Sequence, residues 1–313
     1  LEYALNEVIV GVGGKQCVFN FCLAVLNSGD EVIIPAPYWV SYADIALVSD
    51  AKPIIVECGI EQKFKMTASQ LEKAITSKTK LLILNSPSNP TGAVYSKEEL
   101  TSLADVLIKH PNILIGTDDM YEHVKLKDMP FYNILNVNPA LKDRCVIMNG
   151  VSKAYSMTGW RIGYAAGPSY IIKAMEILQS QSTSNPTSIS QVAAEAALSG
   201  DQACMDPMIK AFRERHAYVV KSFNEIPGLS CIEAEGAFYA FPDARKAIEH
   251  LFNQKVLKEK TDHALADYLL EKEGVAVVPG SAFGSDGYFR ISFATSMENL
   301  IEAMKRIKRA LSV

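Results

Sequence analysis

The chain has 313 residues, of which 49% are hydrophobic and 21% are charged, and its formal net charge is −4. This composition is typical of a folded globular protein, and the weak negative charge argues against a basic nucleic-acid-binding surface. The longest apolar runs, such as residues 32–34 and 81–84, have the length of strands and are too short to span a membrane.

The first two hundred residues alternate short β-rich runs with helical patterns. We predict strands at 31–34, 53–56, 80–84, 113–117, 145–148 and 161–165, and helices at 14–26, 67–75, 97–109 and 170–181. This alternation indicates an α/β fold built on a doubly wound, mostly parallel sheet. The strands are continuous apolar runs, as expected where helices cover both faces of a sheet.

The pattern changes near Pro207. Beyond it we predict helices at 208–223, 262–273 and 297–311 and strands at 275–278 and 289–293. These elements indicate a smaller α+β domain with antiparallel strands. We therefore expect a large α/β domain at residues 1–206 and a small C-terminal domain at residues 207–313.

The cysteines indicate in which cellular compartment the protein is found. They are irregularly spaced, form no CxxC pair and have no histidines beside them. We therefore expect free thiols, no metal site and a reducing, cytoplasmic location. The six cysteines are Cys17, Cys22, Cys58, Cys145, Cys204 and Cys231.

A glycine-rich stretch, GVGGKQ at residues 11–16, opens the first predicted helix. The backbone N–H groups at Gly13 and Gly14 and the positive end of the helix dipole would suit a phosphate. The stretch is neither a P-loop nor a GxGxxG motif. A plain tight turn explains it equally well.

Two further motifs follow predicted strands, where ligands bind in doubly wound sheets. In NSPSNPTG (85–92), Asn89 can offer its amide to a ligand, although a structural turn is the alternative. In TDDMY (117–121), Asp118 is the first acid after the strand, and Tyr121 follows three residues on. Such an aspartate either caps a helix or holds a positively charged ring nitrogen.

Two basic residues lie in apolar surroundings. Lys153 follows strand 145–148, and its small and apolar neighbours suggest a desolvated nucleophile rather than a surface charge. Arg161 lies eight residues later, where a strand is predicted to begin. Farther along, Arg290 lies within the strand of YFRISFAT (288–295), where its guanidinium would pair with an internal acid or a ligand carboxylate.

These residues together match the groups of pyridoxal 5′-phosphate. Lys153 would react with the aldehyde, Arg161 would neutralise the phosphate, and Asp118 would face the ring nitrogen. Asn89 and Tyr121 would then face the phenolic oxygen.

The motifs resemble those of the class I (fold type I) pyridoxal-phosphate aminotransferases, most closely the bacterial and plant-plastid type of aspartate aminotransferase. They occur in the family's order over nearly the whole chain. The matching segments are GGKQ (13–16), PYWVSY (37–42), NSPSNPTG (85–92), DDMYEH (118–123), SKAYSMTGWRIGY (152–164), GAFY (236–239), VPGSAFG (278–284) and RISFAT (290–295).

The resemblance implies a role for each site residue. Lys153 would carry the cofactor covalently and move the proton, and Asp118 would keep the pyridine nitrogen protonated. The other cofactor contacts would be Tyr121 and Asn89 at the phenolic oxygen, Trp39 stacked on the ring, and Gly13, Gly14, Lys15, Ser152 and Arg161 at the phosphate. Arg290 would bind the substrate α-carboxylate, and Trp39 and Asn89 would also contact the substrate.

The chain departs from the family pattern in two places. Asp118-Asp119-Met120-Tyr121 replaces the usual Asp-Glu-Ile-Tyr, and we expect no loss of function because the cofactor-facing Asp and Tyr are kept. The resemblance also indicates that the sequence begins after the family's N-terminal segment. In the family, that segment covers the substrate and supplies a tyrosine to the partner subunit's cofactor phosphate.

The implied activity is transamination between aspartate or glutamate and a 2-oxo acid (2-oxoglutarate or oxaloacetate) by a homodimer. Lys15 is the candidate for reading the distal carboxylate; alternatively, it adds charge near the phosphate or reaches solvent. An aromatic or prephenate aminotransferase is the second interpretation. Another fold type I enzyme, such as a β-lyase or an aminocyclopropane-carboxylate synthase, and a non-catalytic relative are further alternatives.

Overall fold

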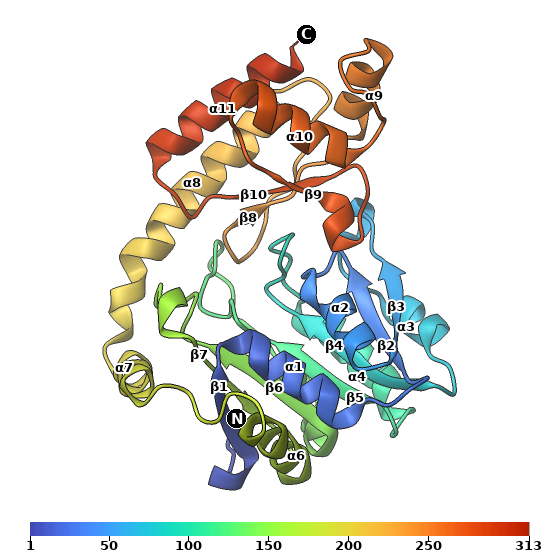
Figure 1. Ribbon diagram of the computed structural model, residues 1–313, viewed down its shortest axis with the longest axis vertical. Coiled ribbons are helices and arrows are strands. Elements are labelled where there is room, and N and C mark those ends of the chain that lie inside the picture. The colour runs from blue at the N-terminus through green and yellow to red at the C-terminus, as the bar shows by residue number, and fades with distance from the viewer. Residues whose placement is uncertain (313) are drawn as a thin grey trace.

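Two β-sheets organise the structure, a computed structural model that describes residues 1–312 (Figure 1). Within these residues, seven strands form the larger sheet in the order β1-β7-β6-β5-β4-β2-β3. The strands from β2 to β6 pair in parallel, whereas β7 runs antiparallel to β1 and β6. The bounds are β1 (Val8–Val12), β2 (Glu31–Ala36), β3 (Lys52–Glu57), β4 (Thr79–Asn85), β5 (Leu114–Asp118), β6 (Cys145–Gly150) and β7 (Ile162–Ala166).

Successive residues of the apolar strands pack alternately into two separate hydrophobic cores. In β2, Val32 and Ile34 belong to one buried cluster and Ile33 to another, because successive side chains of a strand point to opposite faces. Helices α1 (Gly14–Val25), α2 (Ser41–Val48) and α6 (Ser169–Ser180) contribute to the first cluster. Helices α3 (Ala68–Ala74), α4 (Lys97–Ile108) and α5 (Ile134–Val137) contribute to the second. The sheet is therefore covered on both faces.

A smaller antiparallel sheet lies beyond the carboxyl ends of the parallel strands. It consists of β8 (Tyr239–Ala240), β10 (Phe289–Ser292) and β9 (Val278–Pro279), in that order. Its core includes Phe223, Phe289 and Phe293. Four helices pack around it: α8 (Asp206–Asn224), α9 (Arg245–Asn253), α10 (Asp262–Glu273) and α11 (Met297–Leu311). The long helix α8 rises from α7 (Ser188–Ser199) toward the C-terminus, at the opposite end of the molecule from the N-terminus (Figure 1).

The predicted fold class is confirmed, and each strand predicted before residue 170 is present within two residues of its expected bounds. The sequence interpretation missed β1, β8, α2, α5, α7 and α9. The strand predicted at 275–278 is wrong, because β9 begins only at Val278. Val275 instead follows Gly274, the C-cap of α10; its N–H donates to Leu269 O at 3.1 Å, and its side chain enters the core. The domain division after residue 206 stays a prediction, and α8 begins at this position, at Asp206.

Candidate active site

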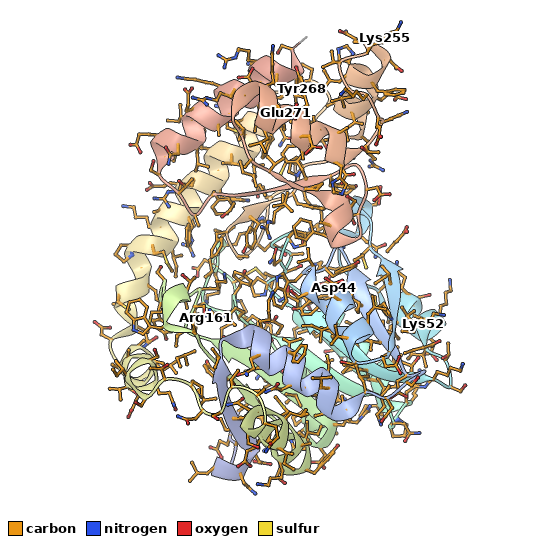
Figure 2. All side chains as sticks on the ribbon, in the orientation of Figure 1. Asp44, Lys52, Arg161, Lys255, Tyr268 and Glu271 are labelled. Atoms are coloured by element: carbon orange, nitrogen blue, oxygen red, sulfur yellow. The ribbon has the colours of Figure 1, made fainter. Side chains whose placement is uncertain are left out.

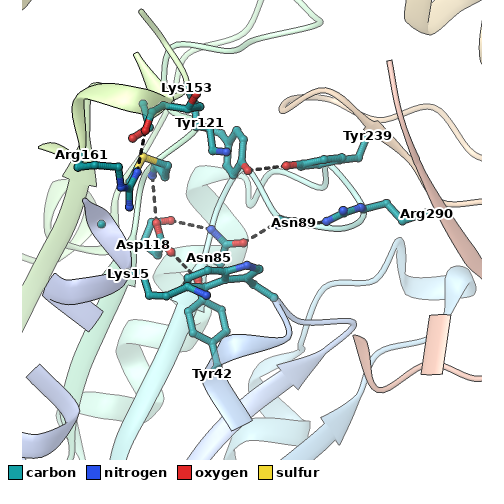
Figure 3. Close-up of a pocket in the computed structure, with 15 residues that line it drawn as sticks. Lys15, Tyr42, Asn85, Asn89, Asp118, Tyr121, Lys153, Arg161, Tyr239 and Arg290 are labelled. Carbon is teal, nitrogen blue, oxygen red and sulfur yellow. Dashed lines mark hydrogen bonds between the residues drawn. The ribbon is translucent and has the colours of Figure 1, made fainter. Parts of the chain in front are cut away.

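A cavity of about 360 Å³ lies where the parallel strands end (Figure 3). Asn85, Asp118 and Gly150 are the last residues of β4, β5 and β6, and their loops form its floor together with the start of α1. The small sheet contributes Tyr239 and Arg290. The lining residues are Gly14, Lys15, Trp39, Tyr42, Asn85, Asn89, Asp118, Met120, Tyr121, Ser152, Lys153, Thr158, Arg161, Tyr239 and Arg290.

The cavity brings together every site residue predicted from the sequence except Gly13. Gly13 lies directly behind the wall, since a Cβ built on it would be 2.3 Å from Nη2 of Arg161. Figure 2 places Arg161 between α1 and the loops above the large sheet. Residues distant in the sequence therefore meet at one edge of the sheet, at the carboxyl ends of the strands, where ligands bind in doubly wound sheets.

The start of α1 forms a cradle without side chains. Gly13 is the N-cap with φ of 84°, a left-handed conformation that glycine adopts readily. A Cβ on Gly14 would lie 2.3 Å from Met120 Cε. The Arg161 guanidinium is fixed beside this cradle because its Nη1 donates to Thr158 O at 2.8 Å. Backbone N–H groups at a helix N-terminus and a guanidinium together suit an anion such as phosphate.

Asp118 is buried, and each of its carboxylate oxygens accepts a hydrogen bond. The Tyr42 hydroxyl donates to its Oδ2 at 2.6 Å, and the Met120 N–H donates to its Oδ1 at 3.2 Å. Asn85 Nδ2 donates to the Asp118 carbonyl at 2.9 Å, which fixes the backbone. Burial raises the pKa of Asp118, while the Tyr42 and Met120 hydrogen bonds and the charge of Lys153 oppose this rise. A cationic group in the cavity would favour the ionised carboxylate.

Lys153 lies above the same cavity, with its Nζ 5.8 Å from the centre of the Phe238 ring. Burial lowers the pKa of Lys153, and the positive charges of Arg290 and Arg161 act in the same direction, whereas Asp118 opposes them. The neutral amine is the nucleophilic form of a lysine. The surroundings of Lys153 therefore favour the reactive form.

Arg290 is fixed but retains free donors. Its Nη1 donates to Asn89 Oδ1 at 2.8 Å, and its Cζ lies 4.6 Å from the Tyr239 ring centre and 4.9 Å from that of Phe283. Its Nε is buried and has no hydrogen-bond partner within residues 1–312. Of the two sequence alternatives, a ligand carboxylate fits better than an internal acid, because an amide is the group bonded here.

Lys15 and Trp39 form one wall of the cavity. The Lys15 Nζ lies 5.0 Å from the centre of the Trp39 ring, within the range of a cation–π contact. The Trp39 ring meets Tyr42 edge-on at 5.3 Å between centres. Lys15 thus adds a positive charge at the cavity, on the side away from Arg290 (Figure 3).

Sequence reasoning missed five lining residues: Tyr42, Asn85, Met120, Thr158 and Tyr239. Asn85 could have been found, because it ends a strand as Asp118 does. Tyr42 lies within the apolar helix α2, and no local pattern distinguishes it from a core aromatic. Tyr239 belongs to the GAFY segment, which carried the resemblance but was given no role.

Neither a metal cluster nor a membrane helix occurs in the part of the chain that the structure describes. Among residues 1–312, no group of three or more His, Cys, Asp or Glu side chains could hold a metal ion. No helix in this range is both long and apolar enough to cross a membrane.

The fold and the cavity are those of an α/β enzyme whose polar site lies at the carboxyl ends of parallel strands. Residues 1–307 match the family model described as aminotransferase class I and II, and the chain belongs to this family. It is therefore an aminotransferase.

Several relatives are similar over the whole chain. An aspartate/prephenate aminotransferase of Nitrosomonas europaea is 60% identical over 312 residues, which cover 100% of this chain and 79% of that protein. The crystal structure of the Rhizobium meliloti aspartate aminotransferase has a TM-score of 0.93 at 46% identity and covers 100% of this chain and 78% of that one. The Thermus thermophilus aspartate aminotransferase with maleate has a TM-score of 0.88 at 38% identity, covering 97% and 76%.

Proposed function

We propose that this aminotransferase uses pyridoxal 5′-phosphate to move an amino group between aspartate or glutamate and a 2-oxo acid. The observation that carries the proposal is the meeting of Lys153, Asp118 and Arg290 on one cavity. A lysine whose pKa is lowered by burial, a buried acid and an arginine with free donors are the three groups that the cofactor aldehyde, its ring nitrogen and a substrate carboxylate require.

The residues present fit this cofactor. The volume of about 360 Å³ is within the usual range for small-molecule sites. The start of α1 leaves no room for a Cβ at Gly13 or Gly14, as a closely approached phosphate cradle requires. Asp118, buried and hydrogen-bonded to Tyr42, would gain a counter-charge from the ring nitrogen in addition to the charge of Lys153.

We assign the cofactor contacts accordingly. The phosphate would be held by Gly13, Gly14 and Lys15 at the start of α1 together with Ser152 and Arg161. Trp39 would stack on the ring, Tyr121 and Asn89 would bind the phenolic oxygen, and Asp118 would bind the ring nitrogen. Lys153 would carry the cofactor covalently.

When bound, the cofactor supplies an electron sink for breaking the substrate Cα–H bond. Once the substrate amine has replaced Lys153 on the cofactor, the freed Lys153 Nζ would accept the proton released from Cα and deliver it to the cofactor carbon C4′. The Asp118 carboxylate would hold the proton on the ring nitrogen by its negative charge. Arg290 would orient the substrate by binding its α-carboxylate in the cavity that Lys153 also lines.

The preference for a dicarboxylic substrate is assigned to Lys15. Arg290 can bind the α-carboxylate of any amino acid, so selectivity needs a second cation at the other side of the cavity. Lys15 meets this requirement, since it lies over Trp39 at the cavity wall. The names of the Rhizobium and Thermus relatives, and maleate in the latter structure, support a dicarboxylate.

Prephenate is the second candidate substrate. The Nitrosomonas relative is named an aspartate/prephenate aminotransferase. Prephenate carries a distal carboxylate on a ring, so Lys15 could serve both substrates. The aromatic residues Trp39, Tyr121 and Tyr239 at the cavity would accommodate a ring.

We also propose a homodimer in the cytoplasm. Ile189 and Val192 on α7 are 79% and 65% exposed, apolar surface that a second copy would bury. The cysteines of residues 1–312 are free, and five of the six are buried, as is typical of a reducing compartment.

A half-reaction screen tests the proposed function. The protein loaded with pyridoxal 5′-phosphate is mixed with each of the twenty amino acids, and the cofactor absorbance band is followed. We expect aspartate and glutamate to bleach the band fastest, and oxaloacetate, 2-oxoglutarate or prephenate to restore it. A protein that binds no cofactor, or one that reacts equally with all amino acids, would refute the proposal.

A further inference from the structure

We infer that Tyr239 is a positioning residue that serves both ends of the ligand site. Its hydroxyl orients Tyr121 toward the cofactor, and its ring holds Arg290 in place for the substrate carboxylate. This inference rests on the proposed function, because it concerns the same cavity.

The first contact is a hydrogen bond between two tyrosine hydroxyls. The Oη atoms of Tyr121 and Tyr239 are 2.8 Å apart, and their ring centres are 5.8 Å apart in an edge-to-face arrangement (Figure 3). Both side chains are buried, with 4% and 6% of their surface exposed. Tyr121 follows β5 of the large sheet, whereas Tyr239 belongs to β8 of the small sheet. The bond therefore links the two sheets across the cavity.

The direction of this bond follows from proton counting. Burial raises the pKa of both tyrosines, so both hydroxyls stay protonated near neutral pH. Each hydroxyl has one proton to donate. If Tyr121 donates to the anionic phenolic oxygen of the cofactor, it must accept from Tyr239. A hydroxyl that accepts a hydrogen bond becomes a stronger donor, so Tyr239 would strengthen the contact of Tyr121 with the cofactor.

The second contact follows from strand register. Tyr239 lies opposite Ser292 in the pairing of β8 with β10, and Arg290 is two residues from Ser292 on the same face. Diagonal neighbours of this kind are within reach of long side chains. The Arg290 Cζ indeed lies 4.6 Å from the Tyr239 ring centre, while Nη1 is bonded to Asn89. The ring thus supports the guanidinium without using its remaining donors.

Two substitutions separate the two roles. Tyr239→Phe removes the hydroxyl and keeps the ring, whereas Tyr239→Leu removes both. In Tyr239→Phe, weaker donation from Tyr121 leaves more electron density on the cofactor and makes it more basic. We expect the pH midpoint of the cofactor absorbance to rise by about 0.5 to 1 unit, the effect of one lost hydrogen bond. The KM for aspartate should change little.

In Tyr239→Leu, the absorbance midpoint should rise by the same amount, and the KM for aspartate should additionally rise about fivefold or more. An unchanged KM in this variant would refute the role of the ring. The same midpoint in Tyr239→Phe and in the wild type would refute the role of the hydroxyl.

A double-mutant cycle distinguishes orientation from general destabilisation. Tyr239→Phe should have no further effect on the midpoint in a Tyr121→Phe background, because the hydroxyl through which Tyr239 acts on the cofactor is already missing. Additive shifts would overturn the inference. Tyr268→Phe is the matched control, since its hydroxyl bonds to Ala310 O at 3.3 Å in the small domain, far from Arg161 (Figure 2). It should leave the midpoint unchanged.

Failure of the inference and of the proposed function would look different. A wild-type protein that shows no cofactor absorbance would refute the function. A wild-type protein with a titrating absorbance band that Tyr239→Phe does not alter would refute only the inference.

Discussion

Burial acts on the acid and the lysine of the site in opposite directions. It raises the pKa of Asp118 and lowers that of Lys153, so that both neutral forms are favoured. The hydrogen bond from the Tyr42 hydroxyl, at 2.6 Å, is the largest influence that opposes the rise in the pKa of Asp118. A ligand with a reactive carbonyl would meet Lys153 in its neutral, nucleophilic form, and a cationic ring nitrogen on the same ligand would favour the ionised form of Asp118.

Substitution of Lys15 tests the substrate assignment. Lys15→Ala should raise the KM for aspartate about tenfold or more, as expected for the loss of one charge-assisted hydrogen bond, and should change the KM for phenylalanine much less. The measurement is steady-state kinetics with both amino acids. Lys52→Ala, an exposed lysine on β3 distant from the cavity, is the control (Figure 2). Equal changes for the two substrates would show that Lys15 does not read the distal carboxylate.

For single residues, the sequence indicated a functional role where the residue type was unusual for its neighbours. Lys153 and Arg290 attract attention because a charge lies among apolar neighbours. Tyr42 and Tyr239 do not stand out in this way, because tyrosines in apolar elements commonly pack in the hydrophobic core. Their roles depend on partners 76 and 118 residues away, contacts that only the tertiary structure reveals.

Among the elements, the contact between α1 and β7 determines the shape of the phosphate cradle. A Cβ on Gly163 of β7 would lie 2.3 Å from the backbone N of Gly14. The β7 backbone cannot move easily, because Gly163 pairs with both Gly11 and Gly150 in the sheet. The strand therefore needs a glycine so that the helix N-terminus can lie this close.

Gly163→Ala tests this requirement. The added methyl group should displace the start of α1 and weaken the binding of pyridoxal 5′-phosphate by about tenfold, the loss expected from one or two cradle hydrogen bonds. Fluorescence titration would measure the dissociation constant. Gly159→Ala is the control, because a Cβ there meets no atom of the described residues within 4 Å. Wild-type affinity in Gly163→Ala would contradict the proposed cradle.

The elements that the sequence predicted well are those with long apolar periodicity. The strands β2, β4 and β5 are buried runs with turn residues at their ends, and both signals are local. Helix α7 was missed because few of its side chains are buried and its pattern is weak. The two-residue strands β8 and β9 exist only through their pairing with β10, which no local pattern encodes.

For the whole molecule, one buried acid makes stability depend on pH. Asp119 accepts a hydrogen bond from Thr117 at 2.7 Å and another from Asn133, and its N–H donates to Met148 O. Burial raises the pKa of Asp119 from an ordinary value of 3.8 to about 7. The folded state therefore holds a proton that the unfolded chain loses near pH 4.

The free energy of unfolding should consequently fall as the pH rises from about 4 to about 7. The contribution from Asp119 is at most on the order of 4 kcal/mol, present below pH 3.8 and lost above the folded-state pKa. In Asp119→Asn this part of the pH dependence should disappear, whereas the exposed control Asp105→Asn should keep it. Urea unfolding at several pH values measures the slope. The same slope in all three proteins would rule out a titrating Asp119.

The association state is the second property of the whole molecule. We expect sedimentation to give twice the mass of one chain. Ile189→Lys together with Val192→Lys should shift the equilibrium toward the monomer by placing charges on the exposed face of α7. A monomeric wild-type protein with full cofactor occupancy would contradict the proposed dimer.

The most direct test of the proposed chemistry is the site of covalent attachment. The protein is incubated with pyridoxal 5′-phosphate, reduced with borohydride and digested, and the modified peptide is identified by mass spectrometry. Because the pKa of Lys153 is lowered by burial and by two neighbouring arginines, we expect the adduct on Lys153 alone and none in Lys153→Ala. A stoichiometric adduct on any other lysine, or none on the wild-type protein, would contradict the central claim.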